Sequence, residues 1–126
     1  MTFRKFAAAM LAGSLLALAP VAGALAQEKP QIAVLLFSRG FEFMVALDQG
    51  AHAEAEKLGV EVTVLDGQSN TEVQTRQIED LLVSGVDAII ISPNNSQEIV
   101  PAVRKANEAN VPVVAVDGVV GEGAEV

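Results

Sequence analysis

The chain has 126 residues and a formal net charge of −8, with sixteen acidic residues, eight basic residues, one histidine and no cysteine. An acidic surface is repelled by nucleic-acid phosphates and by anionic lipid, so neither is an expected partner. Without cysteine the chain has no disulfide, no thiol nucleophile and no lipid-anchored cysteine behind a leader.

Residues 1–26 have the three parts of a secretory signal peptide. Arg4 and Lys5 form a basic start, an apolar run extends from Phe6 to Leu18, and Ala24-Leu25-Ala26 is a small-residue cleavage site. The alternative is an uncleaved anchor, but the apolar run is short for a membrane span. We therefore expect a mature domain of residues 27–126 with a net charge of −10, exported to the periplasm.

The first predicted element of the domain is a strand at residues 32–37, an unbroken apolar run of the length of a strand covered on both faces. A short loop, residues 38–43, follows it. Helical spacing of apolar residues then predicts a helix over 43–58, ended by Gly59. The residues expected to face the sheet from this helix are Met44, Leu47, Ala51, Ala55 and Leu58.

The next elements repeat this pattern. Residues 60–65 alternate apolar with polar, which predicts a strand near the sheet edge. A helix is predicted over 71–84, followed by Gly85. Residues 88–91 are apolar throughout and indicate a central strand.

The last helix and strand are predicted from a cap and a second apolar run. Asn95 is a candidate N-cap, with Glu98 in the capping-box position, for a helix ending near Asn110. Residues 111–116 predict the fourth strand, since Pro112 is tolerated at a strand start.

This β-α-β-α-β-α-β order predicts an α/β fold, a three-layer flavodoxin-like parallel sheet with helices on both faces. Right-handed crossovers with strand order 2-1-3-4 place the first helix on one face and the other two on the opposite face. Ligands of such sheets bind outside the carboxyl ends of the strands. The expected site is therefore framed by residues 38–43, residues 92–95 and Asp117.

Two phenylalanines stand out in the first of these loops. Phe41 and Phe43 offer flat apolar faces on which a sugar ring packs, and Asp117 can accept hydrogen bonds from sugar hydroxyls. Arg39 adds a planar donor. The alternatives are that the two rings plug the sheet end beneath the helix, and that Asp117-Gly118 is a plain turn.

No catalytic or cofactor-binding pattern is present. The single histidine, His52, falls on the charged face of the first helix, where a solvated side chain is expected. The loop FSRGFEF lacks the glycine patterns that cradle phosphates. We expect neither an enzyme nor a cofactor or metal site.

Several stretches together resemble the type I periplasmic sugar-binding proteins of ABC importers, in their ribose- and galactose-binding branch. They are IAVLLFS, GAHAEAEKLG, VTVLDGQSNTEVQTRQIEDLLVSGVDAIIISPNN and NEANVPVVAVD. The resemblance covers residues 30–126 and implies the amino-terminal lobe of a two-lobe protein, with the match stopping before the fifth strand and the hinge. It implies a sugar or polyol ligand, permease subunits as partners, and admits a chemoreceptor as another partner.

The resemblance also assigns roles to individual residues. Phe43 falls where the family stacks an aromatic ring on the sugar, and the Phe43-Met44 pair is like that of glucose and galactose binders. Asp117 matches an acidic hydroxyl-binding residue, and Ser92 falls where ribose binders have asparagine. Two departures are Phe41, where a polar residue is usual, and Gly118, where ribose binders have arginine. The residues expected at the ligand are Ser38, Arg39, Phe41, Phe43, Met44, Ser92 and Asp117.

The predicted function is therefore that of a periplasmic solute-binding protein for sugar transport. One alternative is a stand-alone flavodoxin-like enzyme or flavin binder, for which no phosphate-cradling loop is present. Another is the effector domain of a sugar-responsive repressor, which the leader and the missing helix-turn-helix disfavour.

Overall fold

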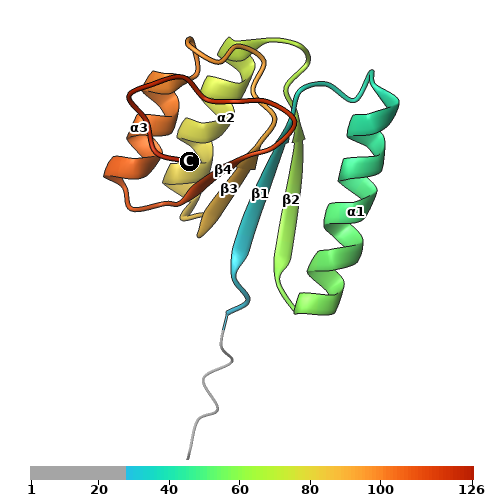
Figure 1. Cartoon of the computed structure of the whole chain (residues 1–126). Coiled ribbons are helices and arrows are strands. Elements are labelled where there is room, and N and C mark those ends of the chain that lie inside the picture. The colour runs from blue at the N-terminus through green and yellow to red at the C-terminus, as the bar shows by residue number, and fades with distance from the viewer. Residues whose placement is uncertain (1–27) are drawn as a thin grey trace, which may run out of the picture.

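The computed structural model describes residues 28–126, which form one parallel sheet between two layers of helices (Figure 1). The predicted leader and its cleavage site lie outside the described residues. The elements are β1 (Gln31–Leu36), α1 (Glu42–Leu58), β2 (Glu61–Asp66), α2 (Thr71–Ser84), β3 (Ala88–Ile91), α3 (Val100–Glu108) and β4 (Val113–Ala115).

The sheet order is β2-β1-β3-β4, with every pair parallel, which confirms the predicted fold class and strand order. As predicted, β2 lies at an edge and β3 lies inside the sheet. In β1, Leu35 pairs with Leu65 of β2 on one side and with Ile91 of β3 on the other.

Two apolar cores cover the two faces of the sheet, because successive side chains of a strand point to opposite faces. Ala33 and Leu35 of β1 pack in a core with residues of α2 and α3, whereas Val34 and Leu36 pack on the other face with Met44 of α1. Helix α1 is thus alone on its face, and α2 and α3 share the opposite one, as predicted (Figure 1).

The predicted start of the third helix at Asn95 is wrong. The side chain of Asn95 accepts hydrogen bonds from the backbone N–H groups of Gln97 and Glu98, but these residues form turns and α3 begins only at Val100. The physical reason is Pro101, whose ring nitrogen has no N–H to donate and which therefore favours the first turn of a helix.

Two details differ from the expected pattern. Leu58 lies on the sheet-facing stripe and lines a groove with residues of the sheet, but at the last position of α1 it stays 67% exposed. The fourth strand was predicted over residues 111–116, but β4 is shorter. Pro112 and Val116, just outside it, each still make one backbone hydrogen bond to β3. The strand ends were predicted to within two residues.

The segment after β4, residues 117–126, folds back over α3 (Figure 1). The guanidinium of Arg104 donates to the carbonyl of Gly123, and the side-chain amide of Asn107 both donates to and accepts from the backbone of Glu125. Val120 and Ala124 add apolar contacts to the core on that face.

Among residues 28–126, no helix combines the length and the apolar character that crossing a membrane requires.

Candidate functional site

The carboxyl ends of the strands and the loops that follow them gather at one edge of the sheet, at the top of Figure 1. Hydrogen bonds tie these loops to one another. Gly67, just after β2, donates its N–H to the carbonyl of Leu36 at the end of β1, and Ser92, just after β3, donates to the carbonyl of Leu35. This edge is where the sequence predicted the ligand site.

The loop after β1 is a tight turn built around Ser38. The Ser38 hydroxyl oxygen accepts a hydrogen bond from Gly40 N–H at 3.2 Å, and the Ser38 carbonyl accepts one from Phe41 N–H at 3.3 Å. A hydroxyl that accepts one bond still has its own proton to donate. Ser38 can thus hold the turn and donate a hydrogen bond to a ligand at the same time.

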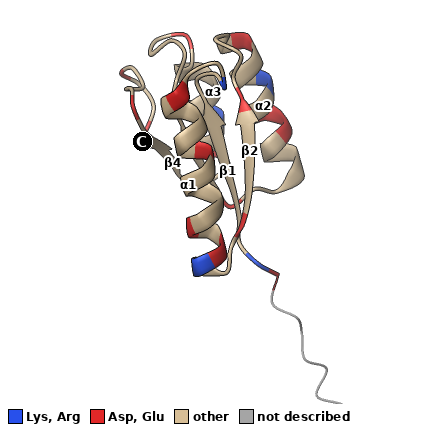
Figure 2. Ribbon diagram, turned by 90° about the vertical axis from the view of Figure 1, so that its right-hand side faces the viewer, with Lys and Arg blue, Asp and Glu red and all other residues tan. Residues whose placement is uncertain are grey.

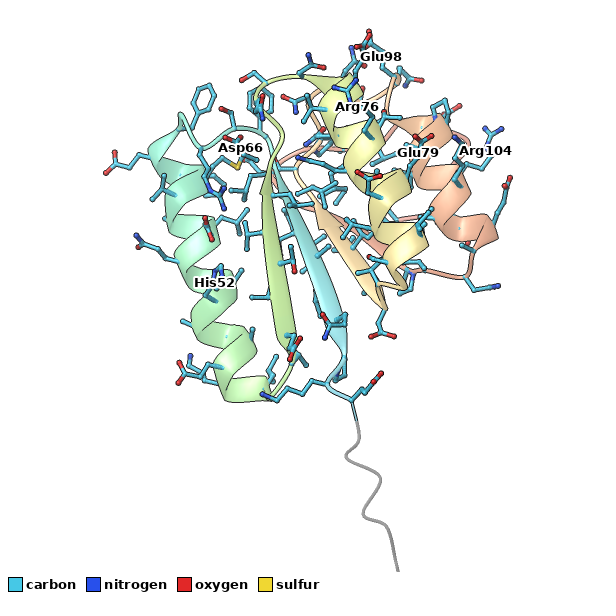
Figure 3. The ribbon with its side chains drawn as sticks, turned by 180° about the vertical axis from the view of Figure 1, so that it is seen from behind. His52, Asp66, Arg76, Glu79, Glu98 and Arg104 are labelled. Atoms are coloured by element: carbon cyan, nitrogen blue, oxygen red, sulfur yellow. The ribbon has the colours of Figure 1, made fainter. Side chains whose placement is uncertain are left out.

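Arg39 fastens this loop to its neighbours. Its backbone N–H donates to the carboxylate of Asp66 at 3.1 Å, and its guanidinium lies 2.9 Å from the carboxylate of Asp48 on α1. A further guanidinium hydrogen bond reaches the carbonyl of Val64 on β2. The Arg39 side chain is therefore directed to the α1–β2 side of the loop. Asp66, which binds the Arg39 backbone, stands at the end of β2 in Figure 3.

The phenylalanines at this edge differ in exposure, with Phe37 half-buried and Phe41 and Phe43 exposed. Phe37 packs with Met44 in the core beneath α1, and its ring meets that of Phe41 edge to face with centroids 5.4 Å apart. Phe41 and Phe43 are nevertheless 54% and 59% exposed. At these exposures Phe41 and Phe43 do not plug the sheet end beneath α1, as the alternative held.

The loop after β4 lies against the loop after β3. A side-chain carbon added at Gly118 would lie 3.2 Å from the ring of Pro93, so this glycine allows the two loops to approach closely. Asp117 is exposed and has a left-handed backbone conformation, with φ of 55°. Ser92 is 2% exposed, so little of it reaches the surface.

The strand order sets the spacing of the exposed groups. The loops after β1 and β4 are separated by β3, which corresponds to about 10 Å across the sheet. Phe41 and Phe43 follow β1 and Asp117 follows β4, so the rings and the carboxylate stand on either side of the loop after β3. The chemistry offered is apolar contact to a flat face and hydrogen bonds to hydroxyl groups.

Other candidate chemistry lies away from this edge. His52 is midway along α1 in Figure 3, where its side chain is 58% exposed and Nδ1 lies 3.0 Å from Asp48 Oδ1. The expected solvated position of His52 is thus confirmed. In the part of the chain that the structure describes, no three histidine, aspartate or glutamate side chains form a group suited to holding a metal ion. The acidic residues of Figure 2 are spread along the helices and loops and over the two ends of β2.

Sequence reasoning missed the residues that organise this edge. Gln74 is fully buried and bonds to the ends of β1 and β3, Asn94 connects the loops after those strands, and Asp66 holds the loops after β1 and β2. One signal was available, because Gln74 lies four residues before Ile78 on the inward stripe of α2. A polar residue at an inward helical position requires buried partners.

A model of the family described as "Periplasmic binding protein domain" matches residues 32–125. Among curated proteins, the ribose import binding protein RbsB of Escherichia coli is 38% identical over 104 residues, which are 82% of this chain and 35% of that protein. The D-ribose/D-allose-binding protein of Pseudomonas aeruginosa is 36% identical over 94 residues, 71% of this chain and 30% of that protein. The chain spans about a third of the length of these relatives.

Solved structures give the same result for the fold. A periplasmic solute-binding protein of Actinobacillus succinogenes with bound D-allose has a TM-score of 0.67 and 33% identity, over 74% of this chain and 33% of that one. The myo-inositol binding protein of Caulobacter, bound to myo-inositol, has a TM-score of 0.71 and 31% identity, over 75% of this chain and 33% of that one.

Proposed function

This chain belongs to the periplasmic binding protein domain family, and we propose that it serves as the solute-binding part of an ABC importer that takes up a sugar or a polyol. The observation that carries the ligand class is the pair of exposed rings, Phe41 and Phe43, at the carboxyl edge of the sheet near the Asp117 loop. Rings of this kind bind the C–H face of a sugar, and a carboxylate binds its hydroxyls.

The relatives support this class without naming the ligand. They include proteins described as binding ribose, allose and galactofuranose, and a structure with bound myo-inositol. All are small, neutral, polyhydroxylated molecules, for which exposed aromatic faces and hydrogen-bonding side chains are suitable. The permease of the importer is the proposed protein partner.

The proposed ligand contacts separate into two groups. Phe41, Phe43, Ser38 and Asp117 present groups that can contact the ligand directly. The remaining predicted residues support them from the core and the loop bases. These are Arg39, which fixes the loop on Asp48 and Val64, Met44, which supports the base of α1, and Ser92, which shapes the loop after β3.

Calorimetric titration of the full chain with D-ribose, D-allose, D-glucose and myo-inositol tests the proposal. We expect saturable heat with at least one of the four. A folded chain that gives no saturable heat with any of them would refute the proposed ligand class.

We further propose that the chain reaches the periplasm by cleavage after Ala26, because Ala24 and Ala26 supply the small side chains that a signal peptidase requires. Amino-terminal sequencing of the periplasmic protein should begin at Gln27. A mature protein beginning at Met1 would contradict this route, and replacing Ala26 with the bulky Phe should leave the precursor uncleaved.

A further inference from the structure

The buried side chain of Gln74, on α2, connects the ends of two strands. Its amide nitrogen donates to the carbonyl of Leu36 at 3.1 Å and to the carbonyl of Ser92 at 2.8 Å. Its amide oxygen accepts a hydrogen bond from the backbone N–H of Asn94 at 2.9 Å. Both amide hydrogens and one oxygen lone pair are therefore used, and the residue is 0% exposed.

Asn94 extends this connection to the aromatic loop. Its side-chain nitrogen donates to the carbonyl of Phe37 at 3.3 Å. Phe37 directly precedes the Ser38–Phe41 turn and contacts the Phe41 ring. The chain of contacts thus runs from α2 through Asn94 to the loop on which the exposed aromatic rings stand.

Gln74 also influences the loop that carries Asp117. Gln74 holds the backbone on both sides of Pro93 through Ser92 and Asn94. Pro93 is the residue against which Gly118 packs, next to Asp117. Fixing Pro93 therefore fixes the surface on which the Asp117 turn rests.

We propose that Gln74 is the positioning residue of the ligand site, holding the loops after β1 and β3 at the separation that ligand binding requires. Core filling alone does not account for a glutamine here. An apolar side chain of the same length would fill the space, but it would leave the Asn94 N–H and the Ser92 carbonyl without this partner. The ligand in this inference rests on the proposed function, whereas the hydrogen bonds of Gln74 do not depend on it.

The test compares Gln74→Met with Ile78→Ala in the full chain. Methionine keeps the length of the side chain and removes all three hydrogen bonds. Ile78 is fully buried on the same helix and bonds to neither loop through its side chain, so Ile78→Ala lowers stability without cutting the connection. Two quantities are measured while both variants remain folded. They are the affinity for whichever of D-ribose, D-allose, D-glucose and myo-inositol binds, and the amide hydrogen exchange of Asn94 and Phe41.

We expect Gln74→Met to weaken sugar binding at least tenfold and to speed exchange at Asn94 and Phe41 beyond the rate set by global unfolding. Ile78→Ala should keep its affinity within about twofold. An equal loss of affinity in both variants, or unchanged exchange at Asn94 in Gln74→Met, would overturn the proposal.

Two additional readouts keep the test decisive. If Gln74→Met does not fold, Asn94→Ala cuts only the side-chain link to Phe37, and it should weaken binding about threefold and speed exchange at Phe41. No change in either would overturn the proposal. If the unmodified chain binds none of the four compounds, the proposed function fails, and the exchange rates at Asn94 and Phe41 alone decide the positioning role.

Discussion

Phe43 and Asp117 are exposed residues placed by different means. Phe43 stands in the first turn of α1, so helix geometry fixes it, whereas Asp117 adopts a left-handed backbone conformation just after β4. In neither case does burial in the core account for the residue. Their role in ligand contact is therefore a proposal that substitution can test.

Alanine substitutions measure what each contributes to binding. Asp117→Ala should weaken sugar affinity about tenfold, because it removes one or two charge-assisted hydrogen bonds. Phe43→Ala should weaken it about threefold to tenfold through the loss of the aromatic stack. Calorimetric titration measures both. Glu122→Ala is the matched control, an exposed acid in the same terminal segment, and its affinity should be unchanged. Equal affinity in all three variants would remove Phe43 and Asp117 from the site.

At the scale of elements, the hydrophobic periodicity predicted the order and type of the elements well. It predicted where they begin and end less well. The bounds of α2 and β3 agree with prediction because Gly85 and the Ser92-Pro93 turn end them sharply. The predicted start of α3 was wrong because the Asn95 side chain caps a turn. The helix itself begins only at Val100, with Pro101 in its first turn. Local hydrogen-bonding residues indicate that a turn exists, but not how far the helix lies beyond it.

The candidate site was predicted in part. The exposed rings and Asp117 follow from strand ends in a parallel sheet, which sequence patterns locate. The supporting contacts of Gln74 and Asn94 do not follow in this way, because each joins residues far apart in the chain. Arg39 shows the same limit, since its partner Asp48 is visible only once α1 is placed beside the loop.

The close approach of loops at Gly67 gives an element-scale prediction. A side-chain carbon there would lie 2.4 Å from the carbonyl oxygen of Leu36 and 2.9 Å from the Gln74 amide nitrogen, so the backbone would have to move. Gly67→Ala should therefore lower the free energy of unfolding by about 1–3 kcal/mol, the range for overpacking. Urea denaturation followed by circular dichroism measures it.

The control for this prediction should change stability in the opposite direction. Gly50 lies within α1 and a side-chain carbon there would meet no atom within 4 Å. Gly50→Ala should raise the free energy of unfolding by about 0.5–1 kcal/mol, because glycine destabilises a helix interior. A Gly67→Ala variant as stable as Gly50→Ala would show that the loops can separate without loss.

At the scale of the whole molecule, the two faces of the sheet are covered unequally. Beside α1 lies a groove of about 390 Å³ lined almost entirely by apolar residues of the sheet and of α1. Val114 of the short edge strand β4 is 53% exposed there, and Leu58 is 67% exposed. An apolar groove beside an edge strand favours association with another chain.

Self-association of residues 27–126 is therefore expected, and it should depend on Val114. Sedimentation velocity should show a coefficient that rises with protein concentration. Val114→Lys should keep the chain monomeric over the same range, because a charged lysine on an edge strand opposes both strand pairing and burial. Val83→Lys adds the same charge at a residue that is 91% exposed on α2, away from the groove, and should associate like the unmodified chain. The net charge of −10 favours repulsion between copies, so the expected association works against the overall charge. Monomers at every concentration, or equal association of the two lysine variants, would show that the groove beside α1 does not drive contact between chains.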